Sequence, residues 1–150
     1  KRQVMRLSDR ALFEVGVAAI SPQAIPLLQK VGDIIARTHF EVRIEGHSDD
    51  LPIKTAQFPS NWELSTARAV NVLRYFLETS GISSHRLSAV GFGEFQPMVP
   101  NDSAAHRAQN RRVEIIFLNA DQKPQSAEAM PRAKKIFAYR AKAVTEAPGG

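Results

Sequence analysis

Two stretches of the chain alternate apolar and polar residues, which is the pattern of strands with one buried face. Residues 40–45 read Phe-Glu-Val-Arg-Ile-Glu, and residues 112–118 read Arg-Val-Glu-Ile-Ile-Phe-Leu. Because Ile116 falls on the otherwise polar side of the second stretch, we expect even that side to be partly covered. Shorter patterns predict two further strands, one near residues 11–14 and one at residues 86–91.

A first amphipathic stretch, with apolar residues at helical spacing, predicts a helix that ends near Thr38. It begins either at Ser21-Pro22 or at Pro26, because a proline beyond the first turn removes an intrahelical hydrogen bond. A second, longer helix is predicted over residues 61–80. A short helix, capped by Asp102 or Ser103, is expected to end at residue 109.

The longer helix has clear signals at both ends. Ser60 can serve as its N-cap, Glu63 can complete a capping box, and Gly81 can end it. Strands separated by helices favour a layered α/β or α+β sandwich in one domain, which we place at residues 1–118. From residue 119 onward prolines, glycines and scattered charges replace the strand pattern, which predicts a flexible basic tail over 119–150.

Charge and composition narrow the possible functions. The net charge is +5, but residues 1–118 hold 14 Lys and Arg against 12 Asp and Glu, so the tail carries much of the basicity. A nucleic-acid-binding face is therefore not indicated. There is no cysteine, which excludes disulfides and thiolate metal sites. No apolar run reaches the roughly 20 residues that span a bilayer, and a chain that opens with Lys1 is expected to be part of a longer protein.

The stretch from Gly46 to Arg68 is the candidate site. Asp49 and Asp50 leave the end of a predicted strand, and the following helix brings Asn61 and Arg68 onto one face. An acid there would take an ammonium and the planar guanidinium would take a carboxylate, so the pattern suits a small zwitterion. The alternative for Arg68 is a surface salt bridge to a helix neighbour.

Other chemistry finds less support. His47, Asp49 and Asp50 match no zinc spacing, and their ordinary interpretation is a strand end followed by a turn. Gly91-Phe-Gly begins like a dinucleotide fingerprint, yet it lacks the third glycine and the helix, so the glycines more simply allow a sharp turn. No Gly-x-Ser-x-Gly elbow is present. We expect neither an enzyme nor a cofactor.

Four separated blocks carry a resemblance to a known family. They are Gly46-His-Ser-Asp-Asp, Asn61-x-x-Leu-Ser-x-x-Arg-Ala, Gly91-Phe-Gly with Pro97, and Ala108-x-Asn-Arg-Arg-Val-Glu. In this order they resemble the OmpA-like peptidoglycan-binding domain over roughly residues 10–118. The longer loop, with Asp-Leu-Pro-Ile and then Phe-Pro-Ser-Asn-Trp-Glu-Leu-Ser, is most similar to MotB-type stator subunits of the flagellar motor. Ser48 stands where the family more often has threonine, a change that keeps the hydroxyl.

The resemblance implies an α+β fold, namely an OmpA-like βαβαβ-type two-layer sandwich with a mixed sheet packed by helices. It also implies non-covalent binding of the diaminopimelate-containing stem peptide of peptidoglycan. Carried over by position, Asp49 and Arg68 are the principal contacts, and Asn61, Leu64 and Arg111 lie beside them. The turn formed by Ser48, Asp50 and Leu51 would supply further backbone donors.

The resemblance further implies a homodimer in the periplasm that anchors a flagellar stator to the cell wall. An upstream transmembrane segment, absent from this sequence, would anchor the protein in the inner membrane and join it to a MotA-type channel subunit. The alternative within this fold is a general envelope tether of the Pal, OmpA or secretion-system type. A wall hydrolase is the alternative from another class.

Overall fold

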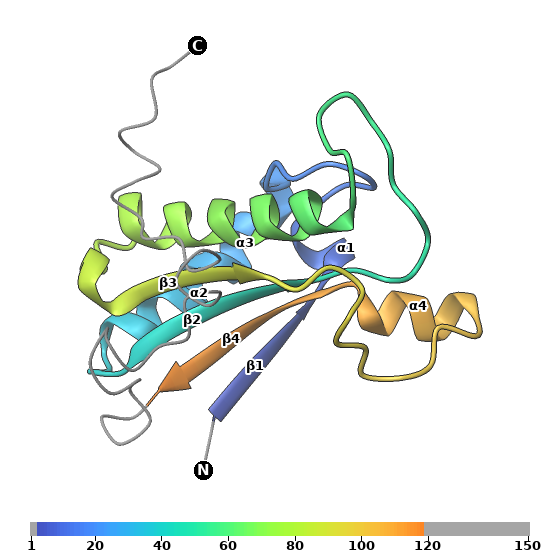
Figure 1. Ribbon diagram of the computed structural model, residues 1–150. Coiled ribbons are helices and arrows are strands. Elements are labelled where there is room, and N and C mark those ends of the chain that lie inside the picture. The colour runs from blue at the N-terminus through green and yellow to red at the C-terminus, as the bar shows by residue number, and fades with distance from the viewer. Residues whose placement is uncertain (1–2, 119–150) are drawn as a thin grey trace, which may run out of the picture.

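The computed structural model describes residues 3–118, which form a four-stranded sheet with α2 and α3 packed on one face (Figure 1). This confirms the α+β class, while the predicted tail at 119–150 lies outside the described residues. In chain order the elements are β1 (Gln3–Ser8), α1 (Asp9–Leu12), α2 (Ile25–Ala36), β2 (Glu41–His47), α3 (Asn61–Glu78), β3 (Leu87–Gly91), α4 (Ala104–Asn110) and β4 (Arg112–Leu118), with 3₁₀ turns at Pro22–Ala24 and Ser84–Arg86.

The sheet is mixed, with strand order β1-β4-β2-β3. β2 and β3 are parallel and are joined through α3, whereas β4 runs antiparallel to both β1 and β2. β4 is therefore a central strand, and all seven of its residues are buried. The expectation from Ile116 is confirmed, because that side chain on the second face is only 2% exposed.

The main core lies between the sheet and the two long helices. Their contact surfaces are the apolar stripes of the helices and the inward side of the strands, as the sequence pattern predicts. The largest fully buried apolar side chains are Phe76, Leu12, Leu28, Ile35, Ile44, Leu73, Ile115, Val42, Val72 and Val113. None of the helices within residues 3–118 combines the length and the apolar character needed to cross a membrane.

The predicted strand near residues 11–14 is wrong. The first strand is Gln3–Ser8, and it is followed by a single helical turn in which the Ser8 hydroxyl accepts a hydrogen bond from the Ala11 amide. The local alternation was weak, and pairing with β4 decided where the strand lies. For the next helix the later start is confirmed, because α2 begins at Ile25 with Pro26 in its first turn.

Two glycines allow α3 to lie directly on the strand ends. Gly46 and Gly91 are partners in the parallel pairing of β2 and β3. A Cβ atom at Gly46 would come within 2.1 Å of the Ser65 carbonyl oxygen, and one at Gly91 within 2.1 Å of the Thr66 hydroxyl. The first turns of α3 can therefore approach the sheet only because both positions lack a side chain.

We expect Gly46→Ala to lower the free energy of unfolding by about 1–3 kcal/mol, because the new methyl group meets the rigid backbone of α3. Denaturant unfolding would measure the change. Ser88→Ala on the half-buried side of β3 is the control, and it should be close to neutral. Equal stability of Gly46→Ala and the wild type would contradict this account of the helix packing.

Candidate functional site

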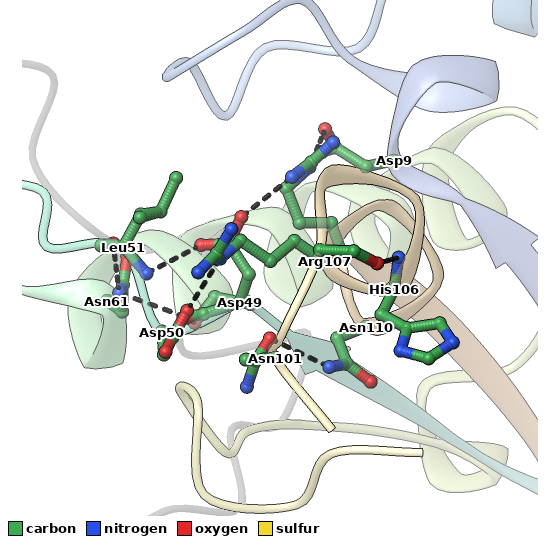
Figure 2. A network of polar contacts seen from close by, with 12 residues as sticks. Asp9, Asp49, Asp50, Leu51, Asn61, Asn101, His106, Arg107 and Asn110 are labelled. Carbon is green, nitrogen blue, oxygen red and sulfur yellow. Dashed lines mark hydrogen bonds and ion pairs between the residues drawn. The ribbon is translucent and has the colours of Figure 1, made fainter. Parts of the chain in front are cut away.

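The turn after β2 is held in place by its own hydrogen bonds and by the start of α3. The carboxylate of Asp49 accepts a hydrogen bond from the Leu51 amide at 3.0 Å, which is an Asx turn. The Asn61 side chain donates to the carbonyl oxygens of Asp49 and Leu51, at 3.3 and 2.9 Å (Figure 2). The Ser48 amide donates to Gly93 at 2.9 Å. The position of Asp49 is thus set by two separate loops and a helix.

The helix that carries Asn61 begins where the sequence predicts. The Ser60 hydroxyl accepts from the Trp62 amide at 3.1 Å and donates to the Glu63 carboxylate at 2.5 Å. The Glu63 carboxylate thus bonds to the hydroxyl of the cap residue, a variant of the capping box. This cap fixes the first residue of α3, and so it fixes which side chains face the turn.

A largely buried chain of alternating charges runs through the site. The Arg68 guanidinium donates to the Asp9 carboxylate. The Arg111 guanidinium lies 3.7 Å from the other oxygen of Asp9 and donates to Asp49 at 2.7 Å. The four side chains come from α3, the start of α1, the α4–β4 junction and the turn after β2. Two cations and two anions therefore alternate, in the order Arg68, Asp9, Arg111, Asp49.

Arg68 also secures the segment that follows α1. Its Nε donates to the Val17 carbonyl at 2.8 Å, and a terminal nitrogen donates to the Glu14 carbonyl at 3.1 Å. The guanidinium lies 4.7 Å from the centre of the Phe13 ring, within range of a cation–π contact. Arg68 is thus a structural residue as well as a member of the charge chain.

Burial makes these charges expensive. Burial raises the pKa of Asp9 above its usual range, although the charges of Arg68 and Arg111 oppose the change. Burial likewise lowers the pKa of Arg68, against the attraction of Asp9. Both shifts mean that the pairing does not fully offset the loss of hydration. Ionisable groups retained at such a cost are typical of functional sites.

The structure brings most of the predicted residues together, but not in the predicted arrangement. Asp49 and Arg68 do not contact each other, because Asp9 and Arg111 stand between them. Ser48 is buried, and its hydroxyl bonds to the Asp49 carbonyl at 2.9 Å. The sequence analysis missed Asp9, since nothing in the weak pattern of the first residues marks it.

Two other predicted residues have different surroundings. Leu51 is 53% exposed at the rim, whereas Leu64 is buried in a small apolar cluster with Phe58 and Ala18. Leu64 therefore supports the loop from beneath and offers no contact surface of its own. The cluster fixes the long loop between β2 and α3.

Arg107, on α4, extends the charge pairing to the surface. Arg107 donates to Asp50 at 3.0 Å, as Figure 2 shows, and Arg111 lies one helical turn later and holds Asp49. Two consecutive acids on the turn thus face two arginines spaced four residues apart. Arg107 was also missed, because its partner is 57 residues away in the sequence.

His47 does not join Asp49 and Asp50 in a metal site. It lies instead in a buried group on the sheet face opposite the helices, 3.3 Å from Glu45 and 3.9 Å from Glu114. No three His, Cys, Asp or Glu side chains within residues 3–118 are grouped so that they could hold a metal ion.

In this group the carboxylate of Glu45 is stabilised. Burial alone would raise the pKa of Glu45, but the hydrogen bond from His47 and the charge of Arg43 outweigh it and lower the pKa. The Arg43 guanidinium donates to Glu45 at 2.8 Å. The folded protein therefore favours the ionised form of this acid.

Comparisons with known proteins agree with the fold. The sequence model of the OmpA family matches residues 12–111 of this chain. Motility protein B of Bacillus subtilis (strain 168) is 34% identical over 116 residues, which cover 77% of this chain and 44% of that protein. The chain spans about half the length of the curated relatives it matches.

Two solved structures are similar over most of the chain. The cell wall anchor of the T6SS from Pseudomonas aeruginosa is 38% identical, with a TM-score of 0.74, and the match covers 77% of this chain and 80% of that chain. A MotB-like protein from Desulfovibrio vulgaris is 40% identical, with a TM-score of 0.73, and the match covers 77% of this chain and 74% of that chain.

We expect Arg68→Ala to lower the free energy of unfolding by about 3–5 kcal/mol, because it leaves the Asp9 carboxylate buried without its main partner. Arg74→Ala, on the same helix, is the matched control. Its pair with Glu78 is exposed, so its loss should cost less than about 1 kcal/mol. Equal losses in the two variants, measured by denaturant unfolding, would show that the buried pair is not structural.

The lowered pKa of Glu45 predicts a pH effect. Its contribution to stability is fully present above the unfolded value of 4.5 and is lost as the pH falls from there through the folded pKa. We therefore expect the stability difference between the wild type and Glu45→Gln to shrink as the pH is lowered below 4.5. Unfolding curves of both proteins over that range measure it, and a constant difference would contradict the assignment.

Proposed function

The chain belongs to the OmpA family, and from that premise we propose that residues 1–118 bind the stem peptide of peptidoglycan non-covalently. The ligand group is diaminopimelate, which carries an ammonium and a carboxylate on one carbon centre. The observation that carries the proposal is the largely buried chain of alternating charges at the strand ends. A zwitterion can enter such a chain and leave every charge with an opposite partner.

The exposures of the four side chains indicate how the ligand would enter. The side chain of Arg111 is 29% exposed, whereas those of Asp9, Asp49 and Arg68 are each 8% exposed. Arg111 is therefore the member that can move. We infer that the ligand ammonium replaces it on Asp49, and that the freed guanidinium turns to the ligand carboxylate.

This exchange favours specificity over raw affinity. The ion pair between Arg111 and Asp49 must break before the ligand can form its own ion pairs. Much of the free energy gained from the ligand therefore only offsets the loss of that pair. A ligand with only an ammonium would leave Arg111 with no partner but its longer contact to Asp9, and one with only a carboxylate would leave Asp49 unpaired. Both charges of diaminopimelate are therefore required.

At the level of the whole protein, we propose a flagellar stator subunit. It would work in the periplasm as a homodimer, tied to the inner membrane by a preceding segment and joined there to a MotA-type channel subunit. The similarity to Motility protein B of Bacillus subtilis supports this assignment. Several charge-assisted contacts held on rigid elements suit an anchor that must resist pulling.

A general envelope tether is the second candidate. The similarity to the cell wall anchor of the T6SS from Pseudomonas aeruginosa favours it, since the same fold would serve another membrane complex there. The sequence ahead of residue 1 distinguishes the two. A single apolar span that contains an acid indicates the stator, and a lipidated cysteine indicates the tether.

The wall-binding proposal is tested by co-sedimentation of the protein with purified sacculi. We expect Asp49→Asn to weaken binding at least about tenfold, because it removes the charged acceptor for the ligand ammonium. Asp33→Asn on the exposed side of α2 removes the same charge elsewhere and should bind like the wild type. Cooperative unfolding of both variants would confirm that they are folded.

Sacculi that contain lysine in place of diaminopimelate provide a second arm, since lysine lacks the side-chain carboxylate. Wild-type binding should fall, and it should fall less for Arg111→Ala, which has already lost the guanidinium that reads this carboxylate. Full binding by Asp49→Asn would refute the site. Release of soluble muropeptides by the wild-type protein would instead indicate a hydrolase.

A further inference from the structure

An exposed pair of stacked aromatic rings lies beside the candidate site. Trp62, in the first turn of α3, is 40% exposed, and Phe95, in the loop after β3, is 61% exposed. The ring centres are 5.0 Å apart, and the planes are inclined by 23°. Large aromatic surface left in contact with water is costly, and it often marks a place where a ligand binds.

The backbone beneath the pair is fixed. The Gly93 amide donates to the Ser65 hydroxyl at 3.0 Å, and Gly93 has a positive φ of 60° that lets the chain turn under the Trp62 ring. Further along the loop, the Met98 amide donates to the side chain of the fully buried Asn110 at 2.8 Å. The loop backbone that carries Phe95 is therefore held in place before any ligand arrives, which lowers the entropic cost of binding.

The pair is continuous with the charged site. Gly93, which lies against Trp62, accepts a hydrogen bond from the amide of Ser48, the residue before Asp49. Trp62 directly follows Asn61, whose side chain holds the Asp49 turn. In Figure 1 the loop after β3 and the start of α3 lie at the same end of the molecule as α4. The segments that carry the two rings are thus hydrogen-bonded to the turn that holds Asp49.

We propose that Trp62 and Phe95 form a second subsite, which stacks against a sugar ring of the glycan strand that carries the bound stem peptide. The inference rests on the proposed function, because it takes the peptide to be seated at Asp49. The C–H faces of a pyranose ring are apolar and flat, and they match exposed aromatic rings. Glu94, which is half-buried, and Gln96, which is exposed, flank Phe95 in the sequence and would supply polar groups for sugar hydroxyls.

The size of the patch argues against a protein partner. A stable protein interface buries about 800 Å² on each side, whereas an aromatic side chain contributes at most roughly 150–250 Å². Two rings that already cover each other offer less than that sum. One sugar ring on the outer face of the pair is the occupant that fits.

The test uses three soluble probes: the stem peptide that contains diaminopimelate, the same peptide attached to its disaccharide, and the disaccharide alone. Trp62 is the single tryptophan of the chain, so its fluorescence reports on the subsite directly. For the wild type we expect the disaccharide-linked peptide to bind about three- to tenfold more tightly than the free peptide. Only the linked peptide should shift the Trp62 emission strongly.

Phe95→Ala should remove this three- to tenfold advantage and leave the affinity for the free peptide unchanged. Ile34→Ala on α2 is the matched control, because Ile34 is 45% exposed and lies away from the loops of the site. It should behave like the wild type with both peptides. Asp49→Asn should weaken both peptides alike.

The two proposals fail in different ways. If Phe95→Ala weakens the two peptides equally, or the wild type shows no preference for the linked peptide, the sugar subsite is refuted and peptide binding stands. If Phe95→Ala changes only the self-association of the protein in sedimentation, the occupant is a second copy and the sugar assignment is overturned. If the wild type binds neither peptide, the proposed function and the subsite fall together.

Discussion

The ion pair between Arg68 and Asp9 connects the parts of the site that are most distant in sequence. Arg68 belongs to a long helix whose register is set by its cap and by two glycines in the strands beneath it. Asp9 begins α1, directly after the first strand, and Arg111 links it to Asp49 in the turn after β2. A pair of this kind is costly to bury, as the pKa shifts of both partners indicate. The packing of the surrounding scaffold offsets this desolvation cost and holds the charged groups in a fixed order.

This order gives the site its chemical character. A lone buried acid would attract any cation, and a lone arginine would attract any anion. In the proposed binding mode an alternating row would discriminate, because a ligand that carries both charges could enter and give each charged group an opposite partner. Arg111 is the more exposed member and, in the proposed exchange, the one that moves, whereas the Asp9–Arg68 pair is more deeply buried. The fold that carries this arrangement is similar to that of the cell wall anchor of the T6SS from Pseudomonas aeruginosa.

Local sequence signals predicted the parts of the fold that local chemistry determines. Ser60 predicted the start of α3, and the alternation at residues 112–118 predicted β4. Both signals are local, because a helix cap and a strand face are each determined by a few consecutive residues. The first strand was misplaced, since its position depends on pairing with β4 more than a hundred residues later. Asp49 and Arg68 were predicted as candidates because they lie at a recognisable strand end and on a recognisable helix face. Asp9 and Arg107 were not predicted, because their roles depend on partners that are distant in the sequence.

The direction of β1 has a mechanical consequence. Gln3 pairs with Phe117, and Ser8 pairs with Arg112 beside the site, so β1 runs lengthwise from the far end of the sheet to the charge chain (Figure 1). Tension applied ahead of Gln3, while a ligand holds the other end, would act along the axis of this strand. Its hydrogen bonds to β4 would then be loaded in shear and share the force, whereas a strand peeled sideways would lose them one at a time.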